Sequence, residues 1–166
     1  MADARTVAGA YGIPVWIHGA DRHLLSTPAA GLGPDAGPLV SSLYGSETLP
    51  EPADVREWAD ADWYGFAGLR WTVLHAPGHT PGSVLLHASD GRDSLLLSGD
   101  VLFAGSIGRT DLPGGSMPEM VASLRDIVLD LPYNLAVLPG HGRRTTIGRE
   151  CTTNPYLQPS FLEQTS

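Results

Sequence analysis

The chain has 166 residues, of which 42% are hydrophobic and 17% are charged, and it carries a net charge of −8. This length and composition describe a folded chain that can bury a substantial core, so we expect residues 1–166 to form a single domain rather than a disordered segment. The acidic balance argues against nucleic acid as a partner. Because no apolar run can span a bilayer and the N-terminus lacks a signal-peptide pattern, we expect a cytoplasmic protein without a membrane partner.

Four segments organise the first half of the chain. Residues 2–11 predict a short helix, and the apolar run at 13–17 predicts a buried strand. Residues 26–52 are rich in Gly, Pro and Ser without periodicity, which predicts a long surface loop that includes a helical turn. Apolar and polar residues alternate over 69–75, a pattern typical of a strand with one buried face.

The second half predicts a hairpin, a helix, a strand and a short final helix. Residues 84–88 and 95–97 flank a turn-rich spacer that contains Asp-Gly, the pattern of a β-hairpin. A capping box then begins a helix over 116–131, and its apolar residues recur at helical spacing: Met120, Val121, Leu124, Ile127, Val128 and Leu131. An apolar strand at 135–138 and a short helix within 147–157 complete the order.

Three of the predicted strands are each followed by a potential metal ligand. His79 follows the strand at 69–75, Asp100 follows the second strand of the hairpin, and His141 follows the strand at 135–138. Taken singly, each residue is more often a surface side chain or a turn former. If the strands lie side by side, however, their ends meet at one rim, where imidazole and carboxylate groups can bind the same ions. The repetition therefore indicates a metal site.

Three sequence motifs carry a family resemblance. They are Ala76-Pro77-Gly78-His79-Thr80-Pro81-Gly82-Ser83, Leu97-Ser98-Gly99-Asp100 and Leu138-Pro139-Gly140-His141-Gly142. Together they resemble the second half of the metallo-β-lactamase superfamily signature. The motifs are similar in particular to those of small bacterial glyoxalase II-like hydrolases. The resemblance extends through three further segments: Gly108-Arg109-Thr110-Asp111, Thr146-Ile147-Gly148-Arg149-Glu150 and Asn154-Pro155-Tyr156-Leu157.

This resemblance implies an αββα sandwich, a mixed α/β (α+β) fold, with two divalent metal ions at one edge of the sheets. Zinc is the expected metal, with iron or manganese as other candidates. His79 would bind one ion, His141 would bind the other, and Asp100 would bridge both and position a hydroxide. That hydroxide would attack the carbonyl of a small-molecule thioester, because a metal lowers the pKa of bound water to about 7. The implied function is a metal-dependent hydrolase of the glyoxalase II type.

One part of the family pattern is missing from the sequence. The family takes its first ligands from an H-x-H-x-D-H motif, and residues 1–166 contain no such motif. His18 and His23 have a different spacing, and they follow the helix and strand that normally come after the motif. The chain therefore corresponds to the C-terminal two-thirds of the family domain, an N-terminally truncated sandwich with an incomplete site, and we expect this chain alone to be inactive.

Two other functions remain open. One is an iron-dependent persulfide dioxygenase of the same superfamily, in which two His and one Asp bind iron, and His79 and Asp100 would fit that set. The ending around His141 resembles the hydrolases more closely. The other is a non-catalytic remnant whose exposed sheet is covered by a protein partner. The sequence carries no readable signal for the acyl group, the carrier thiol, the substrate-binding residues or the oligomeric state.

The remaining polar and aromatic residues have ordinary structural interpretations. Arg109 and Asp111 form either an ion pair at the rim of the site or a solvated turn. Histidines outside the motifs are expected at strand ends or on the surface: His18, His23, His75 and His87. Tryptophans are expected to pack in the core or at sheet edges rather than to line a substrate groove: Trp16, Trp58, Trp63 and Trp71.

Overall fold

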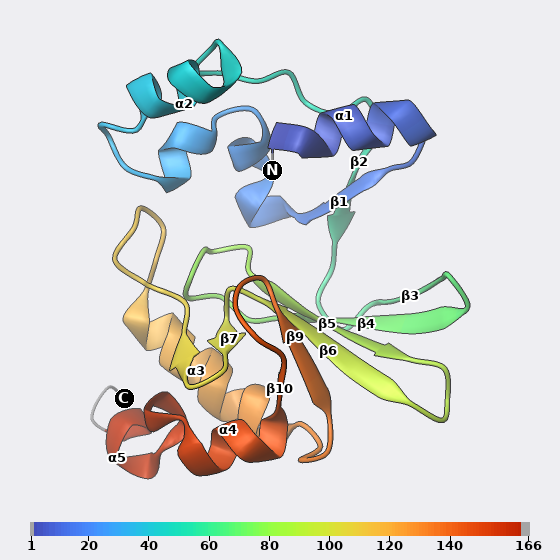
Figure 1. Cartoon of the computed structure of the whole chain (residues 1–166), viewed down its shortest axis with the longest axis vertical. Helices are drawn as coiled ribbons and strands as arrows, with labels where there is room; N and C mark the ends of the chain where they lie inside the picture. Colours follow the sequence, from blue (N-terminus) through green and yellow to red (C-terminus); the bar gives the residue numbers. More distant parts are fainter. Residues whose placement is uncertain (1, 164–166) are drawn as a thin grey trace.

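A computed structural model describes residues 2–163 as a mixed α/β structure (Figure 1). The N-terminal part comprises α1 (Ala2–Tyr11), β1 (Val15–His18), η1 (Gly19–Leu25), η2 (Pro28–Gly31), α2 (Gly37–Tyr44) and β2 (Val55–Trp58). The central part comprises β3 (Trp63–Phe66), β4 (Leu69–His75), β5 (Val84–Ser89), β6 (Ser94–Gly99), β7 (Leu102–Phe103) and β8 (Ser106–Ile107). The C-terminal part comprises α3 (Met117–Asp126), η3 (Val128–Asp130), β9 (Ala136–Pro139), β10 (Thr145–Thr146), α4 (Ile147–Thr153), η4 (Pro155–Leu157) and α5 (Pro159–Leu162).

The larger sheet determines where the strand ends meet. Within the described residues it has six strands in the order β10-β9-β6-β5-β4-β3. Every neighbouring pair is antiparallel except β6 and β9, which are parallel. Consequently β4, β6 and β9 run in the same direction and end at the same edge of the sheet. Two further sheets have two strands each: the small sheet is the parallel pair of β1 and β2, in the register Val15 to Val55, and the other is the antiparallel pair of β7 and β8.

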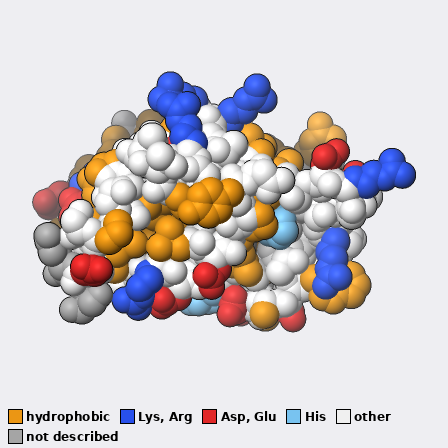
Figure 2. All heavy atoms as spheres, turned by 90° about the horizontal axis from the view of Figure 1, so that it is seen from below, with side chains coloured by type: hydrophobic (Ala, Val, Ile, Leu, Met, Phe, Trp, Pro, Cys, Tyr) orange, Lys and Arg blue, Asp and Glu red, His pale blue; other side chains and the backbone are white. Residues whose placement is uncertain are grey.

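The large sheet separates two groups of elements. Figure 1 shows α1, α2 and the small sheet on one side of it, and the helices α3, α4 and α5 on the other. The main core lies between the sheet and these C-terminal helices; its fully buried side chains include Leu85, Leu96, Met120, Leu124, Val137 and Ile147. In Figure 2, which shows the underside of the molecule, apolar side chains occupy the middle of the face and charged side chains surround them. No helix among the described residues is long and apolar enough to cross a membrane.

Several predicted elements are confirmed. Helix α1 covers Ala2–Tyr11, where the sequence predicts a helix over 2–11. Strand β4 covers Leu69–His75, and β5 and β6 form the predicted antiparallel hairpin. The mixed α/β class is also confirmed. That residues 1–166 are one domain stays a prediction.

The prediction of a loop over 26–52 is wrong in part, because this segment contains the helix α2. Pro38 lies in the first turn of α2, and Gly45 ends the helix in a left-handed conformation with φ 77°. Only Val40 of this helix is buried, whereas Leu39 and Leu43 are exposed. A helix with so little buried surface shows no apolar stripe, and its periodicity is therefore invisible in the sequence.

The helix predicted over 116–131 is shorter than expected. The cap at Ser116 is present, since its side chain accepts a hydrogen bond from the Glu119 amide, but the α-helix ends at Asp126. Ile127 adopts φ −122° and ψ −58°, and the chain continues as the short 3-10 helix η3. Val128 is still fully buried. The apolar spacing continues because both kinds of helix pack on the same sheet, so spacing alone does not mark the end of α3.

The sequence patterns do not predict the short strands β2 and β3. Strand β3 is the edge strand of the large sheet, and mostly exposed residues form it. It joins β4 through Ala67 and Gly68, which have φ values of 54° and 74°. Two consecutive residues with positive φ form the type of tight turn that suits the twist of a hairpin.

Candidate metal centre

Three strand ends deliver the candidate ligands to one edge of the large sheet. His79 follows β4, Asp100 directly follows β6, and His141 follows β9. These strands run in the same direction, as the converging ends require. The expectation that they lie side by side is right for β6 and β9, whereas β5 separates β4 from β6. The loop carrying His79 joins β4 to β5, and it brings His79 past the start of β5 to Asp100.

The side chains of the three residues meet around one carboxylate oxygen. Asp100 Oδ2 lies 3.6 Å from His79 Nε2 and 3.4 Å from His141 Nε2. Both separations exceed the usual N–H···O length of about 2.7–3.2 Å. The His141 side chain is 78% exposed, whereas those of His79 and Asp100 are 22% and 29% exposed. The structure thus brings the three residues together, and their role as metal ligands stays a prediction.

The described residues supply only part of a ligand set. Among residues 2–163, no group of three or more His, Cys, Asp or Glu side chains is arranged to hold a metal ion. The measured distances describe two pairs, His79 with Asp100 and His141 with Asp100. Each pair offers one imidazole nitrogen and one carboxylate oxygen, fewer donors than the four that a zinc ion usually takes.

Glycines in the neighbouring turns let the backbone approach Asp100 closely. The register of β6 against β9 shifts near Gly99, and such bulges often redirect side chains beside functional sites. The Gly140 amide donates a hydrogen bond to the Gly99 carbonyl oxygen over 2.7 Å. A Cβ added at Gly140 would overlap Asp100 Oδ1, and one added at Gly108 would overlap the Asp100 carbonyl oxygen. Glycine is thus required at both positions for this approach.

A backbone carbonyl fixes the orientation of the His79 ring. His79 Nδ1 lies 2.8 Å from the Arg109 carbonyl oxygen. Because a carbonyl only accepts hydrogen bonds, Nδ1 carries the proton and donates it. In the neutral ring Nε2 then has a free lone pair, and this is the atom that faces Asp100.

Of the two interpretations of Arg109 and Asp111, an ion pair at the rim or a solvated turn, the ion pair is present. Arg109 donates from Nε and Nη2 to both Asp111 carboxylate oxygens, over 2.8 and 2.7 Å. The hydrogen bonds from Arg109 lower the pKa of Asp111 to about 2. Both side chains are exposed, so the pair contributes little to global stability. It links neighbouring positions of the loop whose Arg109 carbonyl holds His79.

Two residues that the sequence analysis did not assign to the site support the loop of His79. Asp21, in η1, accepts hydrogen bonds from the Thr80 hydroxyl and from the Gly82 amide. His75 ends β4 as expected, and its Nε2 donates to the Pro81 carbonyl oxygen over 2.8 Å. No sequence signal points to Asp21, because 59 residues separate it from Thr80.

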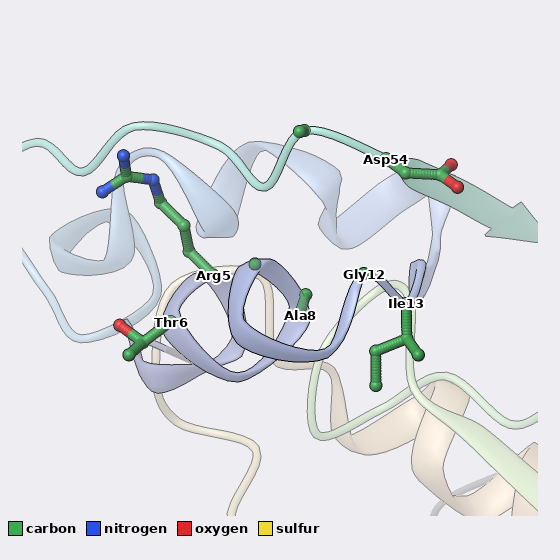
Figure 3. A pocket seen from close by; sticks show the side chains of 8 residues that line it. Arg5, Thr6, Ala8, Gly12, Ile13 and Asp54 are labelled. Atoms are coloured by element: carbon green, nitrogen blue, oxygen red, sulfur yellow. The ribbon is translucent and has the colours of Figure 1, made fainter.

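A hollow of about 330 Å³ lies beside the candidate ligands. It is lined by Asp21, His79, Thr80, Ser83, Val84, Gly99, Asp100 and Val101. A larger hollow of about 600 Å³ lies against α1, where Figure 3 shows Arg5, Thr6, Ala8, Gly12, Ile13 and Asp54 around it. That hollow has no histidine or cysteine in its lining, so its chemistry does not match a zinc site. The smaller hollow is the candidate substrate pocket.

A stacked histidine pair joins the small sheet to the large one next to this site. The rings of His18, at the end of β1, and His75, at the end of β4, have centroids 4.1 Å apart and planes 10° apart. His18 Nδ1 accepts a hydrogen bond from the Ala20 amide at the start of η1. Burial is the main cause that lowers the pKa of His18, and the His75 ring lowers it further, against raising effects from Asp21, Asp60 and Glu57.

We expect the stability of the protein to fall as the pH drops through the ordinary range of histidine. The pKa of His18 is lower in the folded than in the unfolded chain, so the unfolded chain binds more protons below the unfolded value of about 6.5. The contribution of His18 to stability is therefore fully present above that value, and it declines as the pH falls towards the lowered pKa.

Urea unfolding at several pH values measures how the free energy of unfolding changes with pH. His18→Asn keeps a capping acceptor and should reduce the dependence of stability on pH. His23→Asn is the exposed control and should leave that dependence unchanged. The same pH dependence in both variants and in the unchanged protein would contradict the prediction.

The chain belongs to the metallo-β-lactamase superfamily, since the family described as "Metallo-beta-lactamase superfamily" matches residues 1–141. An uncharacterized protein of Mycobacterium bovis (strain ATCC BAA-935 / AF2122/97) is 40% identical over 159 residues, which cover 93% of this chain and 69% of the relative. A probable metallo-hydrolase of Bacillus subtilis (strain 168) is 36% identical and covers 89% of this chain and 65% of the relative. Hydroxyacylglutathione hydrolase GloC of Haemophilus influenzae (strain ATCC 51907 / DSM 11121 / KW20 / Rd) is 41% identical over 90 residues, which cover 54% of this chain and 42% of the relative.

Solved structures agree with this assignment of fold. The B3 metallo-β-lactamase BLEG-1 matches with a TM-score of 0.78 and 37% identity, over 95% of this chain and 71% of that one. TTHA1623 in a di-iron-bound form matches with a TM-score of 0.70 and 35% identity, over 94% of this chain and 71% of that one. The mixed arrangement of helices and sheets is therefore the metallo-β-lactamase fold.

Proposed function

We propose that this chain provides part of a two-metal site for the hydrolysis of a small-molecule thioester in the cytoplasm, a reaction of the glyoxalase II type. His79 would bind one divalent ion, His141 would bind the other, and Asp100 would bridge them. One observation carries this proposal: two imidazole Nε2 atoms face the same oxygen of Asp100, at 3.6 and 3.4 Å.

Each imidazole–carboxylate pair has a donor type and a spacing that suit a divalent ion, although no group of three side chains among the described residues does. Zinc held tetrahedrally by bonds of about 2.0–2.1 Å has neighbouring ligand atoms about 3.3–3.4 Å apart, close to both measured separations. A metal-binding histidine usually donates its other ring N–H to a carboxylate or a backbone carbonyl, as His79 does to Arg109. Further ligands, from an H-x-H-x-D-H segment or from solvent, are needed to complete each ion's shell.

When bound, the ions would supply Lewis-acid activation of water and of the substrate carbonyl. The chain's own residues orient this chemistry. Asp100 is held against the bare backbone of Gly140 and directs one oxygen towards both imidazoles. His79 keeps its Nε2 lone pair free through the hydrogen bond from Nδ1. The hollow of about 330 Å³ beside them has room for a small acyl group.

The choice of substrate and metal draws on the relatives. The match to the hydroxyacylglutathione hydrolase favours a thioester, although it covers only 54% of this chain. The match to the di-iron form of TTHA1623 keeps iron beside zinc as a candidate metal. The match to BLEG-1 makes β-lactam hydrolysis the reaction to compare.

The test compares the 166-residue chain with a fusion that carries an H-x-H-x-D-H segment of a family member before residue 1. Each protein is loaded with zinc, manganese or iron and assayed for hydrolysis of an S-lactoyl thioester, for hydrolysis of a β-lactam, and for oxygen uptake with a persulfide. We expect thioester hydrolysis by the fusion and a rate several powers of ten lower for the chain alone, since electrostatic arrangement supplies most of such rate enhancements.

Three results would overturn the proposal. Oxygen uptake by the iron form without thioester hydrolysis would make the protein a persulfide dioxygenase. Faster turnover of the β-lactam would assign it to the lactamases. A folded fusion that binds metal and is inactive in every assay would support a non-catalytic remnant.

A further inference from the structure

We propose that Asp21 is a positioning residue that sets the orientation of His79 through the loop at residues 80–82. The inference rests on the proposed function in so far as His79 is a metal ligand. Asp21 lies in η1, on the N-terminal side of the large sheet, whereas His79 belongs to the loop between β4 and β5. The contact therefore joins parts of the chain that are far apart in the sequence.

The carboxylate of Asp21 is almost fully engaged by this loop. Asp21 is only 8% exposed. Its Oδ2 accepts a hydrogen bond from Thr80 Oγ1 over 2.5 Å, and its Oδ1 accepts one from the Gly82 amide over 2.8 Å. Removing a carboxylate from water is costly unless donors replace the water. These two donors are the groups that make the buried position acceptable, so the loop and the carboxylate stabilise each other.

The packing around Gly82 leaves the loop little freedom. A Cβ at Gly82 would come within 2.5 Å of Asp21 Cγ, so the backbone of the loop lies directly on the carboxylate. On its other flank the loop is held by the hydrogen bond from His75 to the Pro81 carbonyl. The Thr80 amide is held by Ser83 Oγ. The residue that follows His79 is thus fixed at its hydroxyl and at its amide.

The His79 ring depends on this support. Its Nδ1 has the Arg109 carbonyl as partner, and its Nε2 is the atom that would face the metal. The backbone position that carries the ring is set by the next residues, which Asp21 binds. Loss of Asp21 should therefore let the ring move away from the Arg109 carbonyl, and the ring would lose its single tautomer.

Three variants separate positioning from simple stability. Asp21→Ala removes both acceptors. Asp21→Asn can keep both hydrogen bonds, with its amide oxygen on Gly82 and its amide nitrogen donating to Thr80, and it removes only the charge. Leu25→Ala, in the same 3-10 helix, removes a buried side chain with 6% exposure and leaves the carboxylate in place. It is the matched control for destabilising η1.

The first readout needs no metal. Long-range ¹H–¹⁵N spectra of the metal-free chain report which ring nitrogen of His79 carries the proton. We expect a fixed Nδ1–H tautomer in the unchanged protein, in Asp21→Asn and in Leu25→Ala, and an averaged ring in Asp21→Ala. An unchanged His79 signal in folded Asp21→Ala would overturn the inference. If Asp21→Ala does not fold, Thr80→Val removes the hydroxyl alone, and an unchanged His79 signal in that variant would overturn the inference as well.

The second readout is Co²⁺ affinity, measured by competition with a coloured chelator. Asp21→Ala should weaken Co²⁺ binding about tenfold, which is the usual effect of losing a group that orients a metal ligand without contacting the metal itself. Leu25→Ala should leave the affinity unchanged although it lowers stability. The double variant Asp21→Ala/Thr80→Val should bind no more weakly than Asp21→Ala, because the hydrogen bond that the Thr80 hydroxyl donates to Asp21 is already lost in Asp21→Ala. Equal weakening by Leu25→Ala and Asp21→Ala would show a purely structural role.

The two readouts keep this inference distinct from the proposed function. If the unchanged chain binds no Co²⁺ but Asp21→Ala still releases the His79 ring, the proposed metal site is wrong and the positioning role stands. If Co²⁺ binds and Asp21→Ala changes neither the ring nor the affinity, the metal site stands and the positioning role is wrong.

Discussion

Replacing Asp100 with alanine should lower thioester hydrolysis by the metal-loaded fusion by several powers of ten. Asp100 Oδ2 is the oxygen that both imidazole Nε2 atoms face, so its loss removes the group that would link the two ions. The expected result is a fall in kcat together with a fall in bound metal from two ions to at most one per chain. Hydrolysis assays and metal analysis on the same sample measure both.

Two further variants make this prediction specific. Asp100→Asn keeps the shape of the side chain and removes its charge, and it should behave nearly as Asp100→Ala does. Asp90→Ala is the matched control, because Asp90 directly follows β5 as Asp100 follows β6, but at the opposite edge of the sheet. Its carboxylate accepts hydrogen bonds from the amides of Arg92 and Asp93 in the hairpin turn. Activity retained without Asp100, or lost equally without Asp90, would contradict the assignment of the site.

Replacing Leu124 with aspartate should unfold the protein or destabilise it by at least about 4 kcal/mol. Leu124 is fully buried in the core between α3 and the large sheet. The change removes a packed side chain and leaves a charge without a partner. Because the free energy of unfolding of ordinary domains is about 5–15 kcal/mol, this loss is a large part of the total stability. Urea unfolding followed by circular dichroism measures the difference.

The control for this prediction is the same substitution at an exposed leucine. Leu43 lies in α2 and is 64% exposed, so Leu43→Asp should change the free energy of unfolding by no more than about 0.5 kcal/mol. Similar stability of Leu124→Asp and the unchanged protein would show that the buried face of α3 has been assigned wrongly.

Local patterns predicted the parts of the fold that carry buried strand residues. The alternation over 69–75 and the Asp-Gly spacer predicted β4 and the hairpin, because each of these strands has at least one fully buried position and tight turns need particular residues. The exposed helix α2 and the edge strand β3 left no such pattern. Burial, rather than backbone conformation itself, is what the sequence pattern records.

The sequence by itself determined the chemistry of the candidate site. It supplied two imidazoles and a carboxylate after strands that end in turns, and the glycines that let backbone lie against Asp100. Only the tertiary structure decided that β5 lies between β4 and β6, that the Arg109 carbonyl sets the tautomer of His79, and that Asp21 holds its loop. Each of these contacts joins residues that are distant along the chain, so it depends on how strands pair and layers pack, and neither periodicity nor spacing encodes it.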